Sequence, residues 1–299
     1  MKTPNYLQKG DTVAIIATAR KISLTEIEEA VNLLTLWGLK VVVGKTIGIE
    51  NNQFAGTIEE RVNDLQTVLN DDFIKAIWCA RGGYGTVQLI DLLDFTKFQQ
   101  SPKWIIGYSD ITVLHAHIHN LGIETIHATM PINIPLNSDE AKTTLRKALF
   151  GNQLKYEFPA YEMNIFGNVK GQIVGGNLSV LYSLLGSKSS IETNNKILFI
   201  EDLDEYLYHI DRMLQNLKRN GYFENLAGII VGSMTKMNDN EIPFGKTAEE
   251  IILDFVKPLN IPVVFKVPFG HLDDNRALIF GRNIQLFSNV DSIQIIFEN

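Results

Sequence analysis

The first 135 residues alternate short apolar runs with segments of helical periodicity, and this alternation restricts the fold more than any other feature. The apolar runs have the length and composition of buried strands, and they cover residues 11–17, 39–43, 74–80 and 103–109. The helical segments between them cover residues 24–37, 57–69, 86–95 and 110–121, and Thr57-Ile58-Glu59-Glu60 matches a capping box. Strands that alternate with helices predict parallel pairing in a layered α/β domain.

The pattern changes in the second half of the chain. Residues 136–169 are rich in Pro, Gly and Asn and are expected to form a connection with one short helix. From residue 170 strand-like runs dominate, and the last two are close enough to predict antiparallel pairing. We therefore expect an α/β domain at 1–135, a linker at 136–169 and a mixed α/β domain with a β-rich core at 170–299, which a length of 299 residues allows.

Composition excludes several classes of function. A net charge of −7 argues against a non-specific nucleic-acid-binding protein, which normally carries a basic surface. The single cysteine forbids an intramolecular disulfide, and the N-terminus has no secretory signal pattern. No apolar run approaches the ~20 residues of a membrane helix. We expect a soluble, cytoplasmic protein that binds neither nucleic acid nor a membrane.

A serine at a strand–helix junction is the first candidate for chemistry. Ser109 lies in Gly107-Tyr108-Ser109-Asp110, where an apolar run passes into a helical segment. A serine on such a turn exposes its Oγ, and the N–H groups of the helix start can face a developing anion. Ser109 or Asp110 can equally be a plain helix cap. Ile111 replaces the second glycine of G-x-S-x-G, so an α/β-hydrolase is not indicated.

A glycine-rich loop at residues 81–85, Arg-Gly-Gly-Tyr-Gly, follows the third apolar run. Glycines can present backbone N–H groups to an anion, although the loop lacks both P-loop and G-x-G-x-x-G spacing. A tight turn would explain the glycines but not the arginine beside them. Arg81 and Gly82 are therefore the candidate substrate-binding residues.

Two further candidates lie in the second half. Glu201 follows the apolar run 197–200 and opens an acidic cluster at an expected strand end. His271 follows Pro268-Phe269-Gly270, where a histidine can act as a general base. A solvated acidic loop and an ordinary surface histidine are the alternatives at these two positions.

Four residues look reactive but fit structural roles better. Among His115, His117 and His119, only the first and last share a helix face, and no third ligand is evident, so we expect no metal site. Cys79 lies inside an apolar run and is expected to be a buried thiol rather than a nucleophile.

Taken together, these segments resemble the LD-carboxypeptidase family of serine peptidases, which includes microcin-immunity peptidases. Six stretches match in the order of the family: residues 54–66, 74–95, 102–115, 171–181, 198–214 and 268–281. Six ordered segments are far more specific than any one motif. One departure is visible, because members often have His-Gly-Pro-Met where this chain has His127-Ala128-Thr129-Met130.

The resemblance implies a Ser-Glu-His triad of Ser109, Glu201 and His271. It implies oxyanion donors in the backbone N–H groups of Asp110 and Gly83. It also implies a flavodoxin-like N-terminal domain, similar to a class I amidotransferase, that carries the nucleophile. The acid and base would then come from the β-rich C-terminal domain, with the site in the cleft between them.

The resemblance further implies a homodimer without a cofactor, whose substrate is a murein peptide that loses its terminal D-alanine in cell-wall recycling. Arg81 is the expected partner of the terminal carboxylate, unless it braces its own loop. A rival enzyme would hydrolyse an amide in a peptidyl-nucleotide conjugate, although the short run from Asp202 to Tyr208 leaves little room for the extended loop of immunity members. A catalytically inactive binding protein is the alternative of another class, and the three filled triad positions argue against it.

Overall fold

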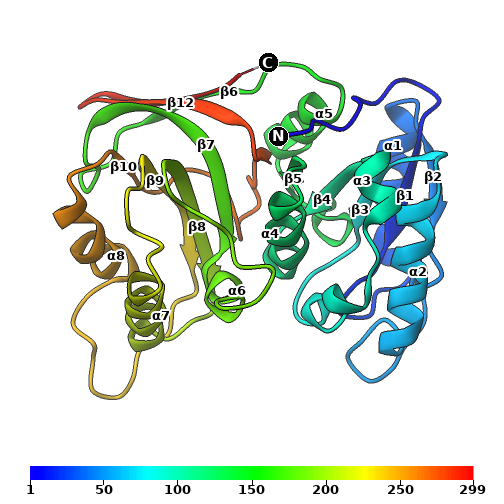
Figure 1. Ribbon diagram of the computed structural model, residues 1–299, viewed down its shortest axis with the longest axis horizontal. Helices are drawn as coiled ribbons and strands as arrows, with labels where there is room; N and C mark the ends of the chain where they lie inside the picture. The colour runs from blue at the N-terminus through cyan, green and yellow to red at the C-terminus, as the bar shows by residue number, and fades with distance from the viewer. Residues whose placement is uncertain (299) are drawn as a thin grey trace.

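The computed structural model describes residues 1–298, which form two β-sheets side by side with helices around them (Figure 1). The first sheet has the strand order β11-β5-β4-β3-β1-β2. Its parallel strands are β1 (Thr12–Ile16), β2 (Lys40–Val43), β3 (Ile74–Cys79), β4 (Trp104–Gly107) and β5 (Thr125–His127). The order 2-1-3-4-5 is that of flavodoxin-like sheets, so the predicted fold class is confirmed.

Three of the four helices predicted for the first half form. Those that form are α1 (Glu28–Leu36) after η1 (Thr25–Ile27), α2 (Ile58–Asn70), and α4 (Thr112–Asn120) after η4 (Ser109–Ile111). The capping box of α2 is complete, because Thr57 Oγ1 accepts from the Glu60 N–H at 3.2 Å and Glu60 Oε2 accepts from the Thr57 N–H at 2.7 Å. The short helix α3 (Thr96–Gln100) was not predicted.

The prediction of a helix at residues 86–95 is wrong. The segment forms two short 3₁₀ turns, η2 (Thr86–Gln88) and η3 (Ile90–Leu92), and is extended at Leu93. Tertiary hydrogen bonds replace the helical ones: the Thr86 N–H donates to Asp110 Oδ2 at 2.9 Å, and the Asp94 N–H donates to Gln66 Oε1 at 2.8 Å.

The second sheet has the strand order β10-β9-β8-β7-β12-β13-β6. Strands β7 (Gly167–Asn177), β8 (Lys196–Leu203), β9 (Gly228–Thr235) and the two-residue β10 (Val263–Val264) are parallel. Strands β12 (Asn283–Ser288) and β13 (Ser292–Phe297) pair antiparallel, as predicted. Helices α6 (Leu178–Ser183), α7 (Leu207–Arg219) and α8 (Ala248–Val256), the last continued by η6 (Lys257–Leu259), pack beside the parallel strands (Figure 1).

Two strands connect the halves in a way that the sequence pattern did not predict. The segment 136–169, expected to hold only one helix, contains α5 (Asp139–Leu149) and also β6 (Lys155–Pro159), which pairs with β13. Strand β11 (Leu278–Phe280) comes from the second half of the chain but pairs antiparallel with β5 of the first sheet. A single buried cluster contains residues of both halves, Trp78 and Phe199 among them, so the two sheets share a core.

The carboxyl ends of the parallel strands carry the candidate residues of the site. In the first sheet, the glycine-rich loop follows β3 and Ser109 follows β4. In the second sheet, Glu201 lies near the end of β8 and His271 lies beyond β10. Ligands of open α/β sheets bind beyond these strand ends. Between residues 1 and 298, no helix has the length and hydrophobicity needed to cross a membrane.

Candidate active site

Ser109 occupies a strained turn between β4 and η4. Its φ of 62° lies in the left-handed region, which costs a residue with a Cβ about 1–2 kcal/mol. Gly107 makes the turn possible, because a Cβ at that position would lie 2.8 Å from Ile111 Cγ1. Backbone strain of this kind persists only where the surrounding structure holds it, and it is frequent at active sites. The turn leaves Ser109 partly exposed between buried neighbours.

The glycine-rich loop lies directly against this turn. A Cβ at Gly82 would be 3.3 Å from both Ser109 Oγ and the Asp110 backbone nitrogen. A Cβ at Gly83 would instead meet the Arg20 side chain at 2.7 Å, and Gly83 has a φ of 110°. The loop therefore presents the α-carbon of Gly82, not that of Gly83, to the serine.

Two buried charged side chains hold the loop in place. The carboxylate of Asp110 accepts the Thr86 N–H at 2.9 Å, and burial raises the pKa of this carboxyl although its hydrogen bonds oppose the shift. Arg61 of α2 donates to the carbonyls of Thr18 at 3.0 Å and Gly85 at 3.1 Å. Sequence reasoning missed Arg61, because nothing distinguishes an arginine on a predicted amphipathic helix from a solvated one.

Arg81 lies in this loop but contacts a different segment. Its Nη1 donates to the carbonyl oxygen of Lys21 at 3.1 Å, which ties the loop after β3 to the loop after β1. The contact corresponds to the bracing alternative considered for Arg81.

In the second half, Glu201 and His271 form a hydrogen-bonded pair. Glu201 is fully buried, and its Oε2 lies 2.6 Å from His271 Nδ1. Burial by itself lowers the pKa of His271, but the charge of Glu201 and the hydrogen bond to it raise that pKa above its ordinary value. A carboxylate on Nδ1 leaves Nε2 as the nitrogen available to a reacting group.

A second carboxylate lies beside this pair. Asn177 Nδ2 donates to Glu201 Oε1 at 3.3 Å and to Asp202 Oδ1 at 2.9 Å, and the Ser179 N–H donates to Asp202 Oδ2 at 2.9 Å. Burial, and then the charge of Glu201, raise the pKa of Asp202 to about 7. Sequence reasoning had placed Asp202 only in an acidic cluster and had not selected Asn177, whose position at the end of β7 beside β8 was the available signal.

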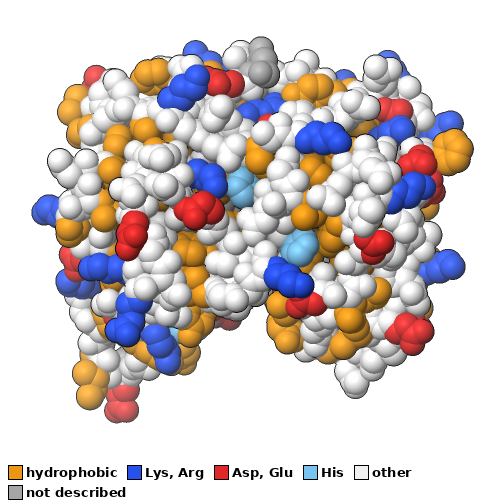
Figure 2. Space-filling model, in the orientation of Figure 1, with side chains coloured by type: hydrophobic (Ala, Val, Ile, Leu, Met, Phe, Trp, Pro, Cys, Tyr) orange, Lys and Arg blue, Asp and Glu red, His pale blue; other side chains and the backbone are white. Residues whose placement is uncertain are grey.

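Tyr108 links the two halves of the site. It precedes Ser109 in the chain, and its ring centroid lies 4.8 Å from that of His271 in an edge-to-face contact. A pocket of about 560 Å³ opens at this contact. Its lining residues are Tyr108, Asn133, Asn137, Leu203, Thr235, Lys236, His271, Leu272 and Asp273. In Figure 2, histidine side chains are visible near the boundary between the two halves.

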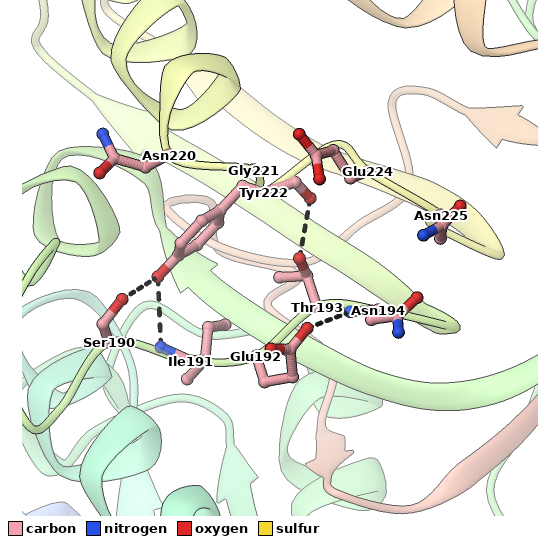
Figure 3. Close-up of a pocket in the computed structure, with 10 residues that line it drawn as sticks. All are labelled: Ser190, Ile191, Glu192, Thr193, Asn194, Asn220, Gly221, Tyr222, Glu224 and Asn225. Atoms are coloured by element: carbon pink, nitrogen blue, oxygen red, sulfur yellow. Dashed lines mark hydrogen bonds between the residues drawn. The ribbon is translucent and has the colours of Figure 1, made fainter.

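Another pocket, of about 460 Å³, lies apart from these residues and carries no comparable chemistry. Its polar groups bond to one another (Figure 3): Tyr222 OH contacts Ser190 Oγ at 3.1 Å, and Thr193 Oγ1 donates to the Tyr222 carbonyl at 2.9 Å. No histidine, cysteine or candidate nucleophile lines it.

Three of the four residues judged to be structural, His115, His117 and Cys79, have surroundings that fit that role. His115 is buried, with Nδ1 2.8 Å from Thr125 Oγ1 and Nε2 2.9 Å from the Gly107 carbonyl oxygen. Nδ1 of His117 lies 3.0 Å from Ser189 Oγ. Burial raises the pKa of the Cys79 thiol to about 12, which suppresses the nucleophilic thiolate.

Comparison with known proteins identifies the family. The model of the LD-carboxypeptidase N-terminal domain matches residues 13–128, and that of the LD-carboxypeptidase C-terminal domain matches residues 170–286. A probable murein peptide carboxypeptidase of Bacillus subtilis is 34% identical over 93% of this chain and 89% of its own length. The murein tetrapeptide carboxypeptidase of Pseudomonas aeruginosa is 30% identical over 93% of each chain.

Solved structures agree. Muramoyltetrapeptide carboxypeptidase from Oxalobacter formigenes superposes with a TM-score of 0.88 and 25% identity, covering 96% of this chain and 99% of its own. A microcin C7 self-immunity protein in complex with aspartyl sulfamoyl adenosine gives a TM-score of 0.88 and 25% identity over 99% of this chain and 98% of its own. With both domain models and relatives of 30% identity or more matching along its length, the chain belongs to the LD-carboxypeptidase family of peptidases.

Proposed function

We propose that this protein is a serine carboxypeptidase with Ser109 as nucleophile, His271 as base and Glu201 as the acid that orients His271. The observation that carries the proposal is the buried Glu201–His271 pair, which contacts Tyr108 next to the strained Ser109. Each half of the molecule would supply part of the machinery, since Ser109 follows β4 and the pair comes from β8 and the loop after β10.

The mechanism is acyl transfer. His271 Nε2 takes the Ser109 hydroxyl proton as Oγ bonds to the scissile carbonyl carbon, while Glu201 accepts from Nδ1–H. The carbon–nitrogen bond then breaks, and the leaving amine receives the proton from His271. Water, deprotonated by His271, then attacks the acyl carbon; the ester bond to Ser109 Oγ breaks, Oγ receives the proton from His271, and the shortened peptide is released.

The oxyanion of the tetrahedral intermediate needs N–H donors. Asp110, directly after the proposed nucleophile, and Gly83 in the glycine-rich loop are the proposed donors, and the neighbouring Gly82 lies so close to Ser109 that a Cβ there would be 3.3 Å from Ser109 Oγ. One such donor is worth about 3 kcal/mol of barrier.

The proposed substrate is a murein tetrapeptide, from which the enzyme removes the terminal D-alanine at an L,D-peptide bond. The names of the relatives from Bacillus subtilis, Pseudomonas aeruginosa and Oxalobacter formigenes support this choice. The likeness to the microcin C7 self-immunity protein favours a second candidate, hydrolysis of a peptidyl-nucleotide amide. Only residues 204–206 separate β8 from α7, which leaves little room for an added nucleotide-binding loop there.

An assay of the purified protein with L,D- and D,D-linked tetrapeptides and an aminoacyl sulfamoyl adenosine tests the proposal. We expect alanine release from the L,D-peptide alone, its loss in Ser109→Ala and its retention in Cys79→Ala. A serine-directed reagent should label Ser109 in a mass spectrum. Full activity of Ser109→Ala, or labelling of another residue, would refute the assignment.

A further inference from the structure

One cation, Lys236, lines the pocket beside His271. No other lysine or arginine is among the residues that line this pocket. Lys236 is exposed and follows β9 directly, where the strand leaves the sheet. A cation there is next to the base of the proposed reaction.

The backbone of Lys236 is held in an unfavourable conformation. Its φ of 52° lies in the left-handed region, which residues other than glycine rarely adopt. The neighbouring Thr235 fixes the turn on both sides: its Oγ1 donates to the His271 carbonyl oxygen at 3.2 Å, and its own carbonyl accepts the Asp204 N–H at 3.0 Å. The position of Lys236 is thus tied to the backbone of His271, and local strain of this kind points to a functional role.

An amide donor lines the same pocket. Tyr108 OH donates to Asn133 Oδ1 at 3.3 Å, and this contact leaves the Asn133 Nδ2 hydrogens for a ligand. An ammonium and an amide N–H₂ together match the two oxygens of a carboxylate.

The pocket also carries one negative charge, Asp273. Among residues 1–298, no ion pair within 4.0 Å joins Lys236 to an acidic side chain, so its ammonium is not committed to Asp273. Arg81, the cation expected from the sequence to hold a carboxylate, donates to the Lys21 carbonyl and is not among the lining residues.

We propose that Lys236, with the Asn133 amide, binds the C-terminal carboxylate of the peptide substrate and so sets the preference for the terminal residue. The inference rests on the proposed peptidase function, and it moves the carboxylate site from the glycine-rich loop to the turn after β9.

The test compares one L,D-tetrapeptide with a free terminal carboxylate and the same peptide with a terminal carboxamide. We expect the native enzyme to prefer the acid, and Lys236→Gln to lower kcat/KM for the acid about 10- to 100-fold, as expected for loss of a charge-assisted hydrogen bond, with the amide nearly unaffected. Lys236→Arg should restore part of the preference. Lys257→Gln, at an exposed lysine of η6 that does not line this pocket, is the matched control.

Binding to the Ser109→Ala protein separates this inference from the proposed reaction. Calorimetry should show tighter binding of the acid than of the amide, and Lys236→Gln in that background should abolish the difference. If the native enzyme hydrolyses the peptide but Lys236→Gln keeps the preference, or Arg81→Gln removes it instead, the carboxylate site is wrong and the peptidase stands. If nothing is hydrolysed yet Lys236 still governs acid binding, the reaction fails and the site stands. Absence of both hydrolysis and binding overturns both.

Discussion

The two halves of the candidate site are built by different physical means. In the first half, a few consecutive residues make the geometry, because Gly107 and the left-handed Ser109 fold the chain into a tight turn after β4. In the second half, Glu201 and His271 are 70 residues apart, and buried hydrogen bonds hold them in place. The proposed nucleophile therefore depends on backbone strain, and the proposed acid–base pair depends on compensated buried charge.

The strongest test of this contrast is Glu201→Gln. The amide keeps the shape but loses the charge that orients His271, so we expect kcat to fall by about 10⁴-fold. The charge of Glu201 raises the pKa of His271, and His271 can act as the proposed base only when it is neutral. In Glu201→Gln the pKa of His271 falls, so His271 becomes neutral at a lower pH. The pH at which any residual activity appears should therefore be lower than in the native enzyme. A pH profile of kcat/KM measures both effects. If the low-pH side of the profile is the same in Glu201→Gln and the native enzyme, Glu201 does not set the pKa of His271.

The second test concerns the glycine-rich loop. In Gly82→Ala, the new Cβ would lie 3.3 Å from Ser109 Oγ and from the Asp110 nitrogen, so it crowds the proposed nucleophile and the proposed oxyanion donor. We expect kcat to fall by about 10²-fold, as for small misplacements of reacting groups. Gly10→Ala, in the turn before β1, is the matched control: its φ of 93° and the open space around it make it a stability variant, with a lower free energy of unfolding. Equal losses of kcat in the two variants would mean that crowding at Ser109 is not the cause.

The third test addresses the buried charge of the second half. The pKa of Asp202 in the folded protein is about 7, above the ordinary 3.8, so its contribution to stability is complete below pH 3.8 and is lost as pH rises through 7. Asp202→Asn cannot titrate. Relative to this variant, the native protein should lose roughly 2 kcal/mol of unfolding free energy between pH 5 and pH 8. Urea denaturation at the two pH values gives the difference, and a constant gap would mean that Asp202 stays charged.

The same contrast explains what could be predicted from the sequence. Local features were readable: the capping box at Thr57 and Glu60 forms, and the run 103–109 passes from strand to turn at Ser109. Features that depend on distant partners could not be read from the sequence. The pairings of β6 and β11 are examples, because their partner strands are far away in the chain. The helix predicted at 86–95 failed for the same reason, since long-range hydrogen bonds replaced local ones.

The candidate site divides in the same way. Glu201 and His271 were named through ordered motifs, and the structure brings their side chains together, while their catalytic roles stay predictions. Asn177 and Arg61 were missed because their partners are carbonyl and carboxylate oxygens on other elements, which no local pattern encodes. Arg81 was a reasonable cation to expect at a strand end, but its guanidinium bonds to a backbone carbonyl.

The smallest expected effect tests the backbone strain at Ser109, the proposed nucleophile. Glycine adopts a φ of 62° without the Cβ clash that alanine or serine suffers. The free energy of unfolding of Ser109→Gly should therefore be about 1 kcal/mol higher than that of Ser109→Ala. Neither variant keeps the hydroxyl, so the comparison isolates the backbone. At Ser101, an exposed residue with a φ of −130°, the order should reverse, because glycine there only adds freedom to the unfolded chain. Equal stabilities of the two Ser109 variants in urea would mean that the turn stores no strain, and the nucleophile would then be held, like the acid–base pair, by its contacts alone.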